Sequence, residues 1–433
     1  MIGGNTIQKV AIIGSSRIPF SRSNSNYKDL SNLDMMSRSL SHLVKKYHLQ
    51  GKTVGEVCIG AIISHSKDWN LAREALLETS LAPETPAYNI QQACATSLQS
   101  TINIANKIAL GQIDCGIAGG TDTTSDAPIV YRQNLSKRLI QLSAAKTLKT
   151  KMQPWKGFHI RELIPELPSN SEPRTGKSMG DHCELMAQEW KISRKNQDKL
   201  ALRSHQNAAR AYKEGFFDDL VTPCEGLRQD NNLRIDTSLT KLGQLRPSFD
   251  RSTKGTLTAG NSSPLTDGAS CVLLGSEDWA KKNDLPILAY FSGAQSAAVN
   301  FLKGEGLLMA PTLAVGKLLQ QNTLNLQDFD YYEIHEAFAA QVLCTLKAWE
   351  SPEYCQSHLK QQLALGSIES DKINVKGGSL AFGHPFAATG ARIVGSLAKM
   401  LREHDGETAR GLISVCTAGG MGVAAMLESP ILH

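Results

Sequence analysis

The stretch Asn374-Val375-Lys376-Gly377-Gly378 opens the part of the sequence that decides the fold. It leads through His384 into a helical spacing of apolar residues over 393–401, and then into an apolar run at 412–416 beside a pair of glycines. This periodicity predicts a strand, a loop with a reactive residue, a helix and a second strand that ends on glycine.

An earlier stretch, Asn89-Ile90-Gln91-Gln92, follows the same plan. It leads to Cys94, then to a helical spacing of apolar residues over 98–109 that Gly111 stops, and then to a strand-like run at 115–120 that ends on glycine. Two copies of one plan predict a duplicated α/β unit. We expect related positions in the two halves to supply chemistry to a single cleft.

Other apolar runs of strand length alternate with helical patterns, which predicts parallel or mixed sheets covered by helices. These further predicted strands are 9–14, 57–63, 287–290 and 331–335. A chain of 433 residues is long enough for two or three folded units. Charged residues make up 20% of it and the net charge is +5, so disorder and dedicated nucleic-acid binding are both excluded.

The cysteines indicate a reducing compartment. The nine of them form no Cys-x-x-Cys pair and no cluster with zinc-ligand spacing, so we expect neither a structural metal nor a disulfide framework. The N-terminal apolar run is too short for a secretory leader, and no run approaches the roughly 18 apolar residues of a membrane span. We therefore expect a cytoplasmic protein.

A block of one charge sign lies in the middle of the chain. Between residues 127 and 161 there is no Asp or Glu, but there are eight basic residues: Arg132, Lys137, Arg138, Lys146, Lys149, Lys151, Lys156 and Arg161. A solvated face usually carries both signs. The block therefore predicts contact with something anionic, either the phosphates of a ligand, a partner protein or a lipid surface. A long helical pattern follows at 181–212.

Two cysteines and two histidines stand where strands meet helices. Cys94 opens a helix, whose unpaired amides favour a thiolate. His384 lies in a glycine-flanked loop, His335 ends a strand, and Cys416 ends a strand against a glycine-rich run suited to anion binding. Each residue alone is explained as well by packing, because free cysteines and histidines are common in protein cores. Their matching placement in duplicated halves favours one catalytic site.

Five motifs resemble those of the thiolase family, in family order and over nearly the whole chain. They are QACATS at 92–97, GNSSPLTDGA at 260–269, HEAFAAQ at 335–341, NVKGG at 374–378 with GHPFAATGAR at 383–392, and CTAGGMG at 416–422. A set of this length does not arise by chance. The histidine in HEAF is similar to that of the thiolase subunit of fatty-acid β-oxidation multienzymes, as are AFGHPF at 381–386 and SMGD at 178–181.

The resemblance implies an α/β fold of two similar halves in five layers, α-β-α-β-α, with an inserted loop domain. The N-terminal half would comprise residues 1–122 and 265–285, the inserted domain with CoA or partner contacts 123–264, and the C-terminal half 286–433. The resemblance also implies a homodimer or higher oligomer. It leaves two further interactions open: binding of a large hydratase/dehydrogenase subunit and peripheral contact with a membrane.

The resemblance assigns roles to residues of the motifs. Cys94 is similar to the nucleophile that becomes acylated, and His384 to its activating partner. Cys416 is similar to the acid/base that moves protons at the acetyl methyl carbon and the incoming thiol. His335, where many thiolases have Asn, would donate to an enolate oxygen. The amides of Cys94 and Ala418 would bind the tetrahedral oxyanion, with Ala418 where glycine is commoner.

Coenzyme A is a substrate in this chemistry, which requires no metal or redox cofactor. By resemblance, Ser263 meets the pantetheine arm, Phe249 lies near the adenine and Met179 flanks the acyl substrate. The predicted reaction is cleavage of 3-ketoacyl-CoA by CoA, through acyl-Cys94, to acetyl-CoA and a shortened acyl-CoA. An acetoacetyl-CoA thiolase working in the condensing direction and a non-catalytic acyl-CoA carrier remain alternatives.

Overall fold

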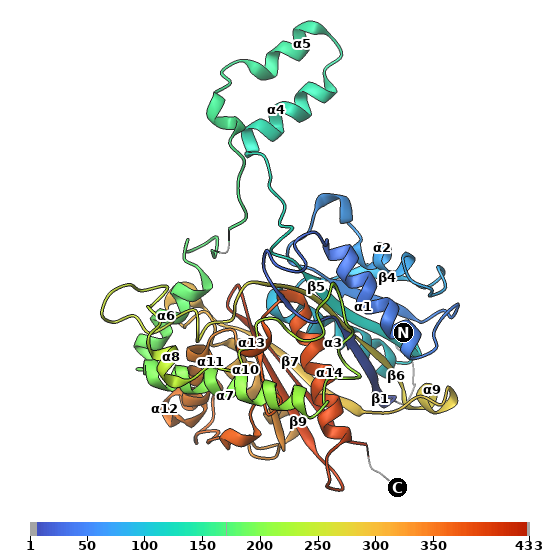
Figure 1. Ribbon diagram of the computed structural model, residues 1–433, viewed down its shortest axis with the longest axis vertical. Coiled ribbons are helices and arrows are strands. Elements are labelled where there is room, and N and C mark those ends of the chain that lie inside the picture. The colour runs from blue at the N-terminus through green and yellow to red at the C-terminus, as the bar shows by residue number, and fades with distance from the viewer. Residues whose placement is uncertain (1–6, 170, 431–433) are drawn as a thin grey trace.

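A computed structural model describes residues 7–169 and 171–430 (Figure 1). Residues 1–6, the first part of the N-terminus predicted to hold no leader, lie outside the described residues. The strands are β1 (Val10–Arg17), β2 (Ser21–Arg22), β3 (Glu56–Gly60), β4 (Ala87–Asn89), β5 (Cys115–Asp122), β6 (Thr266–Ser276), β7 (Ala289–Ala298), β8 (Tyr331–Ile334), β9 (Arg410–Thr417) and β10 (Met421–Glu428).

The helices connect these strands and cover their faces. They are α1 (Asn32–Lys46), α2 (Leu71–Leu77), α3 (Thr96–Ala109), α4 (Gln133–Ala144), α5 (Leu148–Met152), α6 (Met179–Glu189), α7 (Arg194–Lys213), α8 (Leu239–Gly243), α9 (Glu277–Lys282), α10 (Ala310–Asn322), α11 (Ala339–Glu350), α12 (Pro352–Tyr354), α13 (Ser379–Phe382) and α14 (Thr389–Arg402). No helix within the described residues is long and apolar enough to cross a membrane.

The strands form two half-sheets with the same topology. The first has the order β4-β3-β5-β6-β1, and the second has the order β7-β10-β9-β8. In the first, β5 is antiparallel to β6 and parallel to β3; in the second, β9 is antiparallel to β10 and parallel to β8. The predicted duplication is therefore confirmed. Only two residue pairs, Ala11 with Tyr290 and Ile12 with Ala289, join β1 to β7 across the seam.

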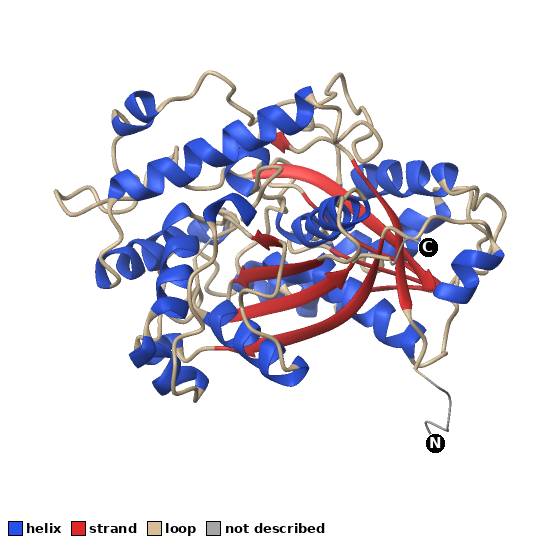
Figure 2. Ribbon diagram, turned by 90° about the horizontal axis from the view of Figure 1, so that it is seen from below, coloured by secondary structure: helices blue, strands red, loops and turns tan. Residues whose placement is uncertain are grey.

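Helices and half-sheets alternate in five layers, as predicted. Helices α1 and α2 pack on the first half-sheet, α10 lies against β7 and β10 of the second, and α3 and α14 pack on each other between the halves (Figure 2). Of the 14 residues of α14, 12 are buried. Its buried residues are mostly apolar or glycine, but they include the polar Thr389, Arg392 and Ser396. Strands β5 and β6 are buried along their whole length because helices cover both of their faces.

The structure corrects the predicted elements in two places. The helical pattern at 181–212 is broken into α6 and α7, because Lys191 takes a left-handed φ of 52° and Ser193 caps α7 by accepting from the amide of Asn196. The predicted strand at 374–378 is a loop with a φ of 48° at Asn374, preceded by a single bridge. The backbone of Ile334 pairs with the Asn374 side chain there.

One segment stands away from the layered body. Residues 127–167, which we call the arm, carry α4 and α5 and rise from the body on two extended stretches of chain (Figure 1). The two stretches pair where the amides and carbonyls of Val130 and Glu166 exchange hydrogen bonds of 2.7 and 3.3 Å. The arm contains the whole of the basic block.

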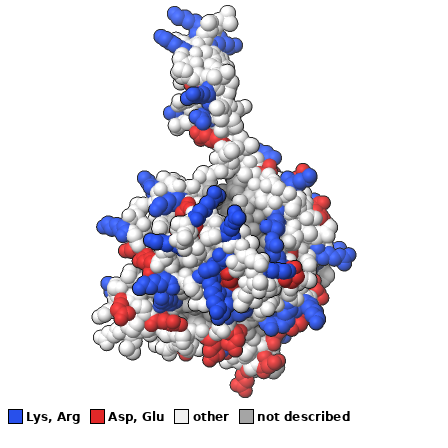
Figure 3. Space-filling model, turned by 60° about the vertical axis from the view of Figure 1, so that its left-hand side comes forward, with Lys and Arg blue, Asp and Glu red and all other residues white. Residues whose placement is uncertain are grey.

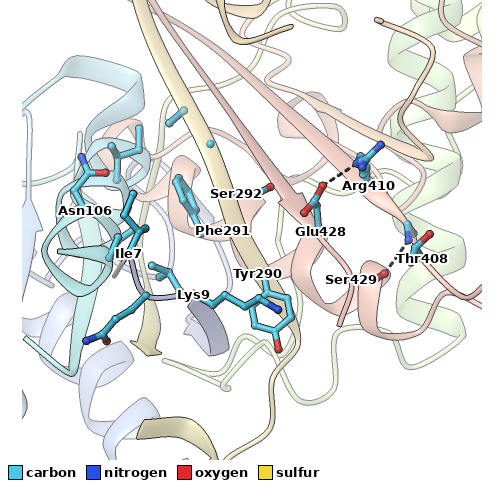
Figure 4. Close-up of a pocket in the computed structure, with 18 of the residues that line it drawn as sticks. Ile7, Lys9, Asn106, Tyr290, Phe291, Ser292, Thr408, Arg410, Glu428 and Ser429 are labelled. Carbon is cyan, nitrogen blue, oxygen red and sulfur yellow. Dashed lines mark hydrogen bonds and ion pairs between the residues drawn. The ribbon is translucent and has the colours of Figure 1, made fainter. Parts of the chain in front are cut away.

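A cavity of about 700 Å³ opens where the two half-sheets separate beside the seam (Figure 4). Lys9 at the start of β1, Tyr290 at the start of β7 and Arg410 at the start of β9 line it. An ion pair of 2.8 Å between Arg410 and Glu428 closes one side. Because Cys416 lies at the other end of β9, the cavity and the residues predicted to be catalytic lie at opposite ends of the strands.

Candidate active site

Three of the predicted residues converge from the two halves of the fold. Cys94 lies in a single 3-10 turn just before α3, His335 follows β8, and His384 lies in the loop between α13 and α14. The Cys94 sulfur and one ring nitrogen from each histidine lie within 4.8 Å of one another. The imidazole centroids are 4.1 Å apart. The duplicated plan thus brings its two reactive loops to one place.

The turn that presents Cys94 is strained. Ala93, the residue before it, has a φ of 44°, a conformation that costs a non-glycine residue about 1–3 kcal/mol. The hydroxyl of Thr96 holds the turn, since it donates to the carbonyl of Ala93 at 2.7 Å and accepts from the amide of Gln92 at 2.9 Å. The Cys94 sulfur that follows this turn lies within 4.8 Å of a ring nitrogen of each histidine.

Burial dominates the acidity of Cys94. It raises the pKa of the thiol to about 12, with the nearby carboxylate of Asp122 acting in the same direction, while the backbone amides of Ala418 and Cys94 oppose the rise. The prediction that the helix start favours a thiolate is therefore wrong for the unliganded site. The amides are present, but removal of water outweighs them. Cys94 is therefore a thiol in the unliganded site, and it would have to lose its proton to a neighbouring base before it could act as a nucleophile.

Cys416 is the second thiol of the site. It ends β9 with 1% of its surface exposed, and its pKa is raised well above the ordinary value by burial and then by Cys94. The apolar cluster around it includes Phe338 and, at its partly buried edge, Met179 and Phe249. A protonated thiol among apolar side chains is suited to delivering a proton to carbon.

The glycine-rich run after Cys416 is held in place by an acid. The amide of Gly419 donates to the carboxylate of Glu172 at 2.6 Å. The left-handed residues of this turn are Gly419 and Gly420, with φ of 78° and 71°. Ala418 does not need the conformational freedom of glycine, which explains how its methyl group is tolerated. The Ala418 amide faces the Cys94 sulfur, as an oxyanion donor must.

The hydrogen bonds around His384 define its tautomer. Thr389 donates its hydroxyl proton to the carbonyl of Pro385 at 3.1 Å, so its oxygen accepts from Nδ1–H of His384 at 2.6 Å. The other ring nitrogen, Nε2, then carries a lone pair. It is buried and has no hydrogen-bond partner among the described residues. His384 is thereby arranged as a proton acceptor beside Cys94.

The network around His335 defines the opposite tautomer. Arg392 donates to the hydroxyl oxygen of Ser379 at 3.2 Å, and within the described residues the one acceptor in reach of the Ser379 hydroxyl proton is Nδ1 of His335 at 2.9 Å, which favours donation to that nitrogen. In that tautomer Nε2 of His335 carries the hydrogen, and within the described part of the chain nothing accepts it. His335 is thereby arranged as a hydrogen-bond donor to a ligand. The two rings offer one acceptor and one donor to the same space.

Both histidines are neutral at physiological pH. Burial lowers the pKa of His384 to about 3, and Arg392 adds to the shift. Burial also moves the pKa of His335 well below its ordinary value, with His384 and Arg392 contributing. Because a lowered pKa disfavours the imidazolium, each ring is neutral and carries a single hydrogen in the unliganded site.

A layer of buried polar groups supports these residues, and the sequence reasoning assigned none of them. Glu333 lies 3.7 Å from Arg392, and burial raises the pKa of its carboxyl to about 8. Asp122 accepts from the amides of Ile63 and Ala387, each within 2.8 Å, which ties the His384 loop to the first half. Thr389 and Arg392 lie inside the GHPFAATGAR motif, so the motif was the available sequence signal for these supporting residues.

The residues predicted to contact substrate lie at the edge of the site. Met179 starts α6, and Phe249 packs edge-on against Phe338 with ring centroids 5.9 Å apart. The amide of Ser263 donates to the carbonyl of Ala337 at 2.9 Å, next to the His335 loop. Their roles toward CoA stay predictions. Cys94, His335 and His384 are also of the residue types that bind zinc.

The site combines a protonated thiol with a neutral histidine placed to accept its proton. Two amides are directed at the sulfur, and a second buried thiol lies nearby. This combination defines an acyl-transferring enzyme with two cysteines. The sequence matches the family described as thiolase, N-terminal domain, over residues 10–278 and that described as thiolase, C-terminal domain, over residues 285–429. The chain belongs to the thiolase family.

Full-length relatives and solved structures agree with this assignment. A 3-ketoacyl-CoA thiolase of Photorhabdus laumondii is 38% identical over 426 residues, covering 97% of each chain, and one of Yersinia pestis is 37% identical over the same length. The crystal structure of the Bacillus anthracis acetyl-CoA acetyltransferase has a TM-score of 0.82 at 29% identity and covers 99% of this chain and 100% of its own. Human mitochondrial 3-ketoacyl-CoA thiolase in complex with CoA has a TM-score of 0.79 at 28% identity, covering 98% and 99%.

Proposed function

We propose that the protein is a 3-ketoacyl-CoA thiolase of fatty-acid β-oxidation, which cleaves 3-ketoacyl-CoA with CoA. The observation that carries the proposal is the pair of opposite histidine tautomers facing Cys94, because carbon–carbon cleavage needs both a base for the thiol and a donor for an enolate oxygen. The full-length likeness to 3-ketoacyl-CoA thiolases supports this substrate class.

The first half-reaction acylates Cys94. His384 takes the thiol proton at Nε2, and the sulfur attacks the 3-keto carbon, whose oxygen turns to the amides of Cys94 and Ala418. As this adduct collapses, the bond between C2 and C3 breaks and its electron pair forms the enolate of acetyl-CoA. His335 and the newly protonated His384 both donate to the enolate oxygen. Cys416 then protonates C2, and acetyl-CoA leaves.

The second half-reaction returns the enzyme to its starting state. The Cys416 thiolate left by the first step takes the proton of the incoming CoA thiol. The CoA sulfur attacks the thioester carbon of acyl-Cys94, and the same two amides bind the oxyanion. Cys94 departs as a thiolate and recovers its proton from His384. The shortened acyl-CoA is released, and both cysteines are thiols again.

The substrate class is tested by the rate of CoA-dependent cleavage of 3-ketoacyl-CoA substrates from four to sixteen carbons. We expect cleavage to extend well beyond the four-carbon substrate, because β-oxidation removes two carbons per cycle from longer chains. Activity confined to acetoacetyl-CoA would favour the condensing enzyme instead. Binding of acyl-CoA without cleavage of any chain length would favour the carrier.

His335 offers a separate test of the enolate donor. We expect His335→Ala to lower turnover by about a hundredfold or more, because an oxyanion donor in a buried site contributes about 2.7–4 kcal/mol. His335→Asn, which keeps a donor, should retain measurable activity. Steady-state cleavage rates measure both, with His42→Ala as a control because His42 bonds to Ser16 outside the site. Equal rates for His335→Ala and the unaltered enzyme would make His335 structural.

The assembly and the location of the protein are part of the same proposal. A homodimer is supported by β4, an edge strand whose pairing within the described residues is to β3 alone, since unpaired edges accept a strand from another chain. CoA binding is supported by the CoA complex of the human relative. The nine free cysteines favour a reducing compartment such as the cytoplasm. A hydratase/dehydrogenase partner remains a proposal drawn from resemblance.

A further inference from the structure

Two ring nitrogens of the active site are buried without a partner. Nε2 of His335 and Nε2 of His384 are enclosed, and no described residue forms a hydrogen bond to either atom. The two residues expose 1% and 4% of their surface. Leaving a buried polar atom unpaired is unfavourable, so both nitrogens are available to a ligand in the unliganded site.

The Cys94 sulfur completes a cluster of three metal-binding atoms. It and one ring nitrogen of each histidine lie within 4.8 Å of one another. Among the described residues, no other group of three or more His, Cys, Asp or Glu side chains is placed to share an ion. One thiolate and two imidazoles suit zinc, which in open sites takes three protein ligands and a water. The three residues are far apart in the sequence, so zinc-ligand spacing could not reveal them.

Zinc fits the cluster after a modest contraction. Its bonds are about 2.3 Å to sulfur and about 2.0–2.1 Å to nitrogen, so a tetrahedral ion holds its ligand atoms roughly 3.3–3.6 Å apart. From separations of at most 4.8 Å, each pair of atoms has to close by no more than about 1.5 Å. This closure is smaller than the roughly 3 Å that a cysteine sulfur moves between staggered rotamers.

Hydrogen bonds behind the cluster orient the rings as metal ligands are oriented. A metal-bound histidine donates its other ring N–H to an oxygen. Nδ1–H of His384 already donates to the Thr389 hydroxyl at 2.6 Å. His335 takes the same form when its hydrogen moves from Nε2 to Nδ1, where the Ser379 oxygen lies at 2.9 Å. His384 is therefore a preformed ligand, and His335 becomes one by a change of tautomer.

The charges around the cluster accommodate a cation bound with a thiolate. Besides burial, Asp122 raises the pKa of Cys94, so the same carboxylate attracts a cation held by the sulfur. Burial raises the pKa of Asp122 to about 7, and a neighbouring cation favours its charged form. Arg392 opposes a cation, but Glu333 lies 3.7 Å from its guanidinium. Zinc with one thiolate adds one positive charge, which the Asp122 carboxylate offsets.

We propose that Cys94, His335 and His384 form a binding site for a thiophilic divalent cation, zinc, and that the bound ion reversibly blocks the enzyme. On binding, the Cys94 thiol releases its proton to solvent and the sulfur and both Nε2 atoms become ligands. The ion then holds the sulfur and the lone pair that acylation needs. The inhibition rests on the proposed function, whereas the binding does not, and the reaction itself uses no metal.

Binding of metal to the surface is the competing explanation for any uptake. Carboxylates prefer hard cations, and Figure 3 shows those of the body mixed with lysine and arginine side chains. A sulfur ligand distinguishes the two places, because its charge-transfer absorption reports the cluster and not the surface acids.

Titration with cobalt(II), which occupies zinc sites and is coloured, tests the binding without an activity measurement. We expect about one equivalent to produce a sulfur-to-cobalt charge-transfer band in the near ultraviolet, and zinc to remove it by displacement. Cys94→Ser should lose the band. His335→Asn should weaken cobalt binding by at least about a hundredfold, since even the outer hydrogen-bond partners of metal ligands contribute about 10–100-fold. Cys416→Ser is the matched control and should keep the band, because that thiol lies in the same site but outside the cluster.

Acylation of Cys94 by a 3-ketoacyl-CoA tests the inhibition, without free CoA because its thiol would itself bind zinc. We expect zinc to block acylation, a chelator to restore it, and prior acylation of Cys94 to prevent cobalt binding. His335→Asn, which should keep measurable activity, should need at least about a hundredfold more zinc.

The outcomes separate the metal site from the proposed function. A charge-transfer band that Cys94→Ser or His335→Asn leaves intact would overturn the proposal, since the metal would then be bound elsewhere. Undiminished acylation with the cluster saturated by zinc would overturn the inhibition. Cobalt binding at the cluster of a protein that cleaves no 3-ketoacyl-CoA would instead refute the proposed function and support the metal site.

Discussion

Cys94→Ser is expected to lower the rate of thiolytic cleavage by at least about a thousandfold, equivalent to roughly 4 kcal/mol of transition-state stabilisation. Burial already raises the pKa of Cys94 to about 12, and in the proposed mechanism a neutral His384 takes the proton. A serine hydroxyl in the same place is far harder to ionise, so the same base can no longer generate a nucleophile.

The measurement is single-turnover cleavage of a 3-ketoacyl-CoA, together with a thermal unfolding curve that shows the variant to be folded. Cys58→Ser is a matched control, because Cys58 is a buried strand cysteine outside the site. We expect the control to keep most of its activity. A Cys94→Ser variant with rates near those of the control would remove Cys94 from the mechanism.

Cys416→Ser is expected to separate the two half-reactions. Exchange of the acetyl methyl hydrogens of acetyl-CoA with solvent should fall below detection, because a hydroxyl buried in the same apolar cluster is a much weaker acid/base than a thiol. Transfer of an acyl group from a simple acyl-CoA to Cys94 should be impaired but detectable, since His384 and the two amides remain.

Proton exchange in deuterated water, followed by NMR or mass spectrometry, measures the first effect, and the radiolabel or mass gained by the protein measures the second. Undiminished exchange in Cys416→Ser would show that another group moves the proton. Loss of acyl transfer to the same extent as exchange would mean that Cys416 acts on Cys94 itself and not on the substrate carbon.

The architecture was accessible from sequence wherever the signal was periodic. The repeated plan around Cys94 and His384 predicted duplicated halves, and the buried strands read as apolar runs because helices cover both of their faces. The helix predicted over 181–212 was wrong because apolar spacing continues across Lys191, whose left-handed backbone has no composition signal. Strand β10 was not predicted, although it lies between β7 and β9, and β6 was indicated only by the apolar strand pattern around Cys271.

The electrostatics of the site depend on distances that no sequence pattern contains. A helix start favours a thiolate in isolation, but the pKa of Cys94 follows from how completely water is removed and from Asp122, 28 positions away in the chain. The histidine tautomers depend in the same way on Thr389, Ser379 and Arg392, which become neighbours only in the fold. The sequence therefore predicted which residues meet, and the structure adds which of them accepts a proton and which donates.

The central claim is that Cys94 carries the acyl group. The most direct measurement is brief incubation of the unaltered enzyme with a 3-ketoacyl-CoA in the absence of free CoA, acid quenching, and peptide mass analysis. We predict a shortened acyl group on the peptide containing Cys94, because only that sulfur lies beside both a proton acceptor and the amide of Ala418. An acyl group found mainly on the peptide containing Cys416 would contradict the account and exchange the roles of the two cysteines.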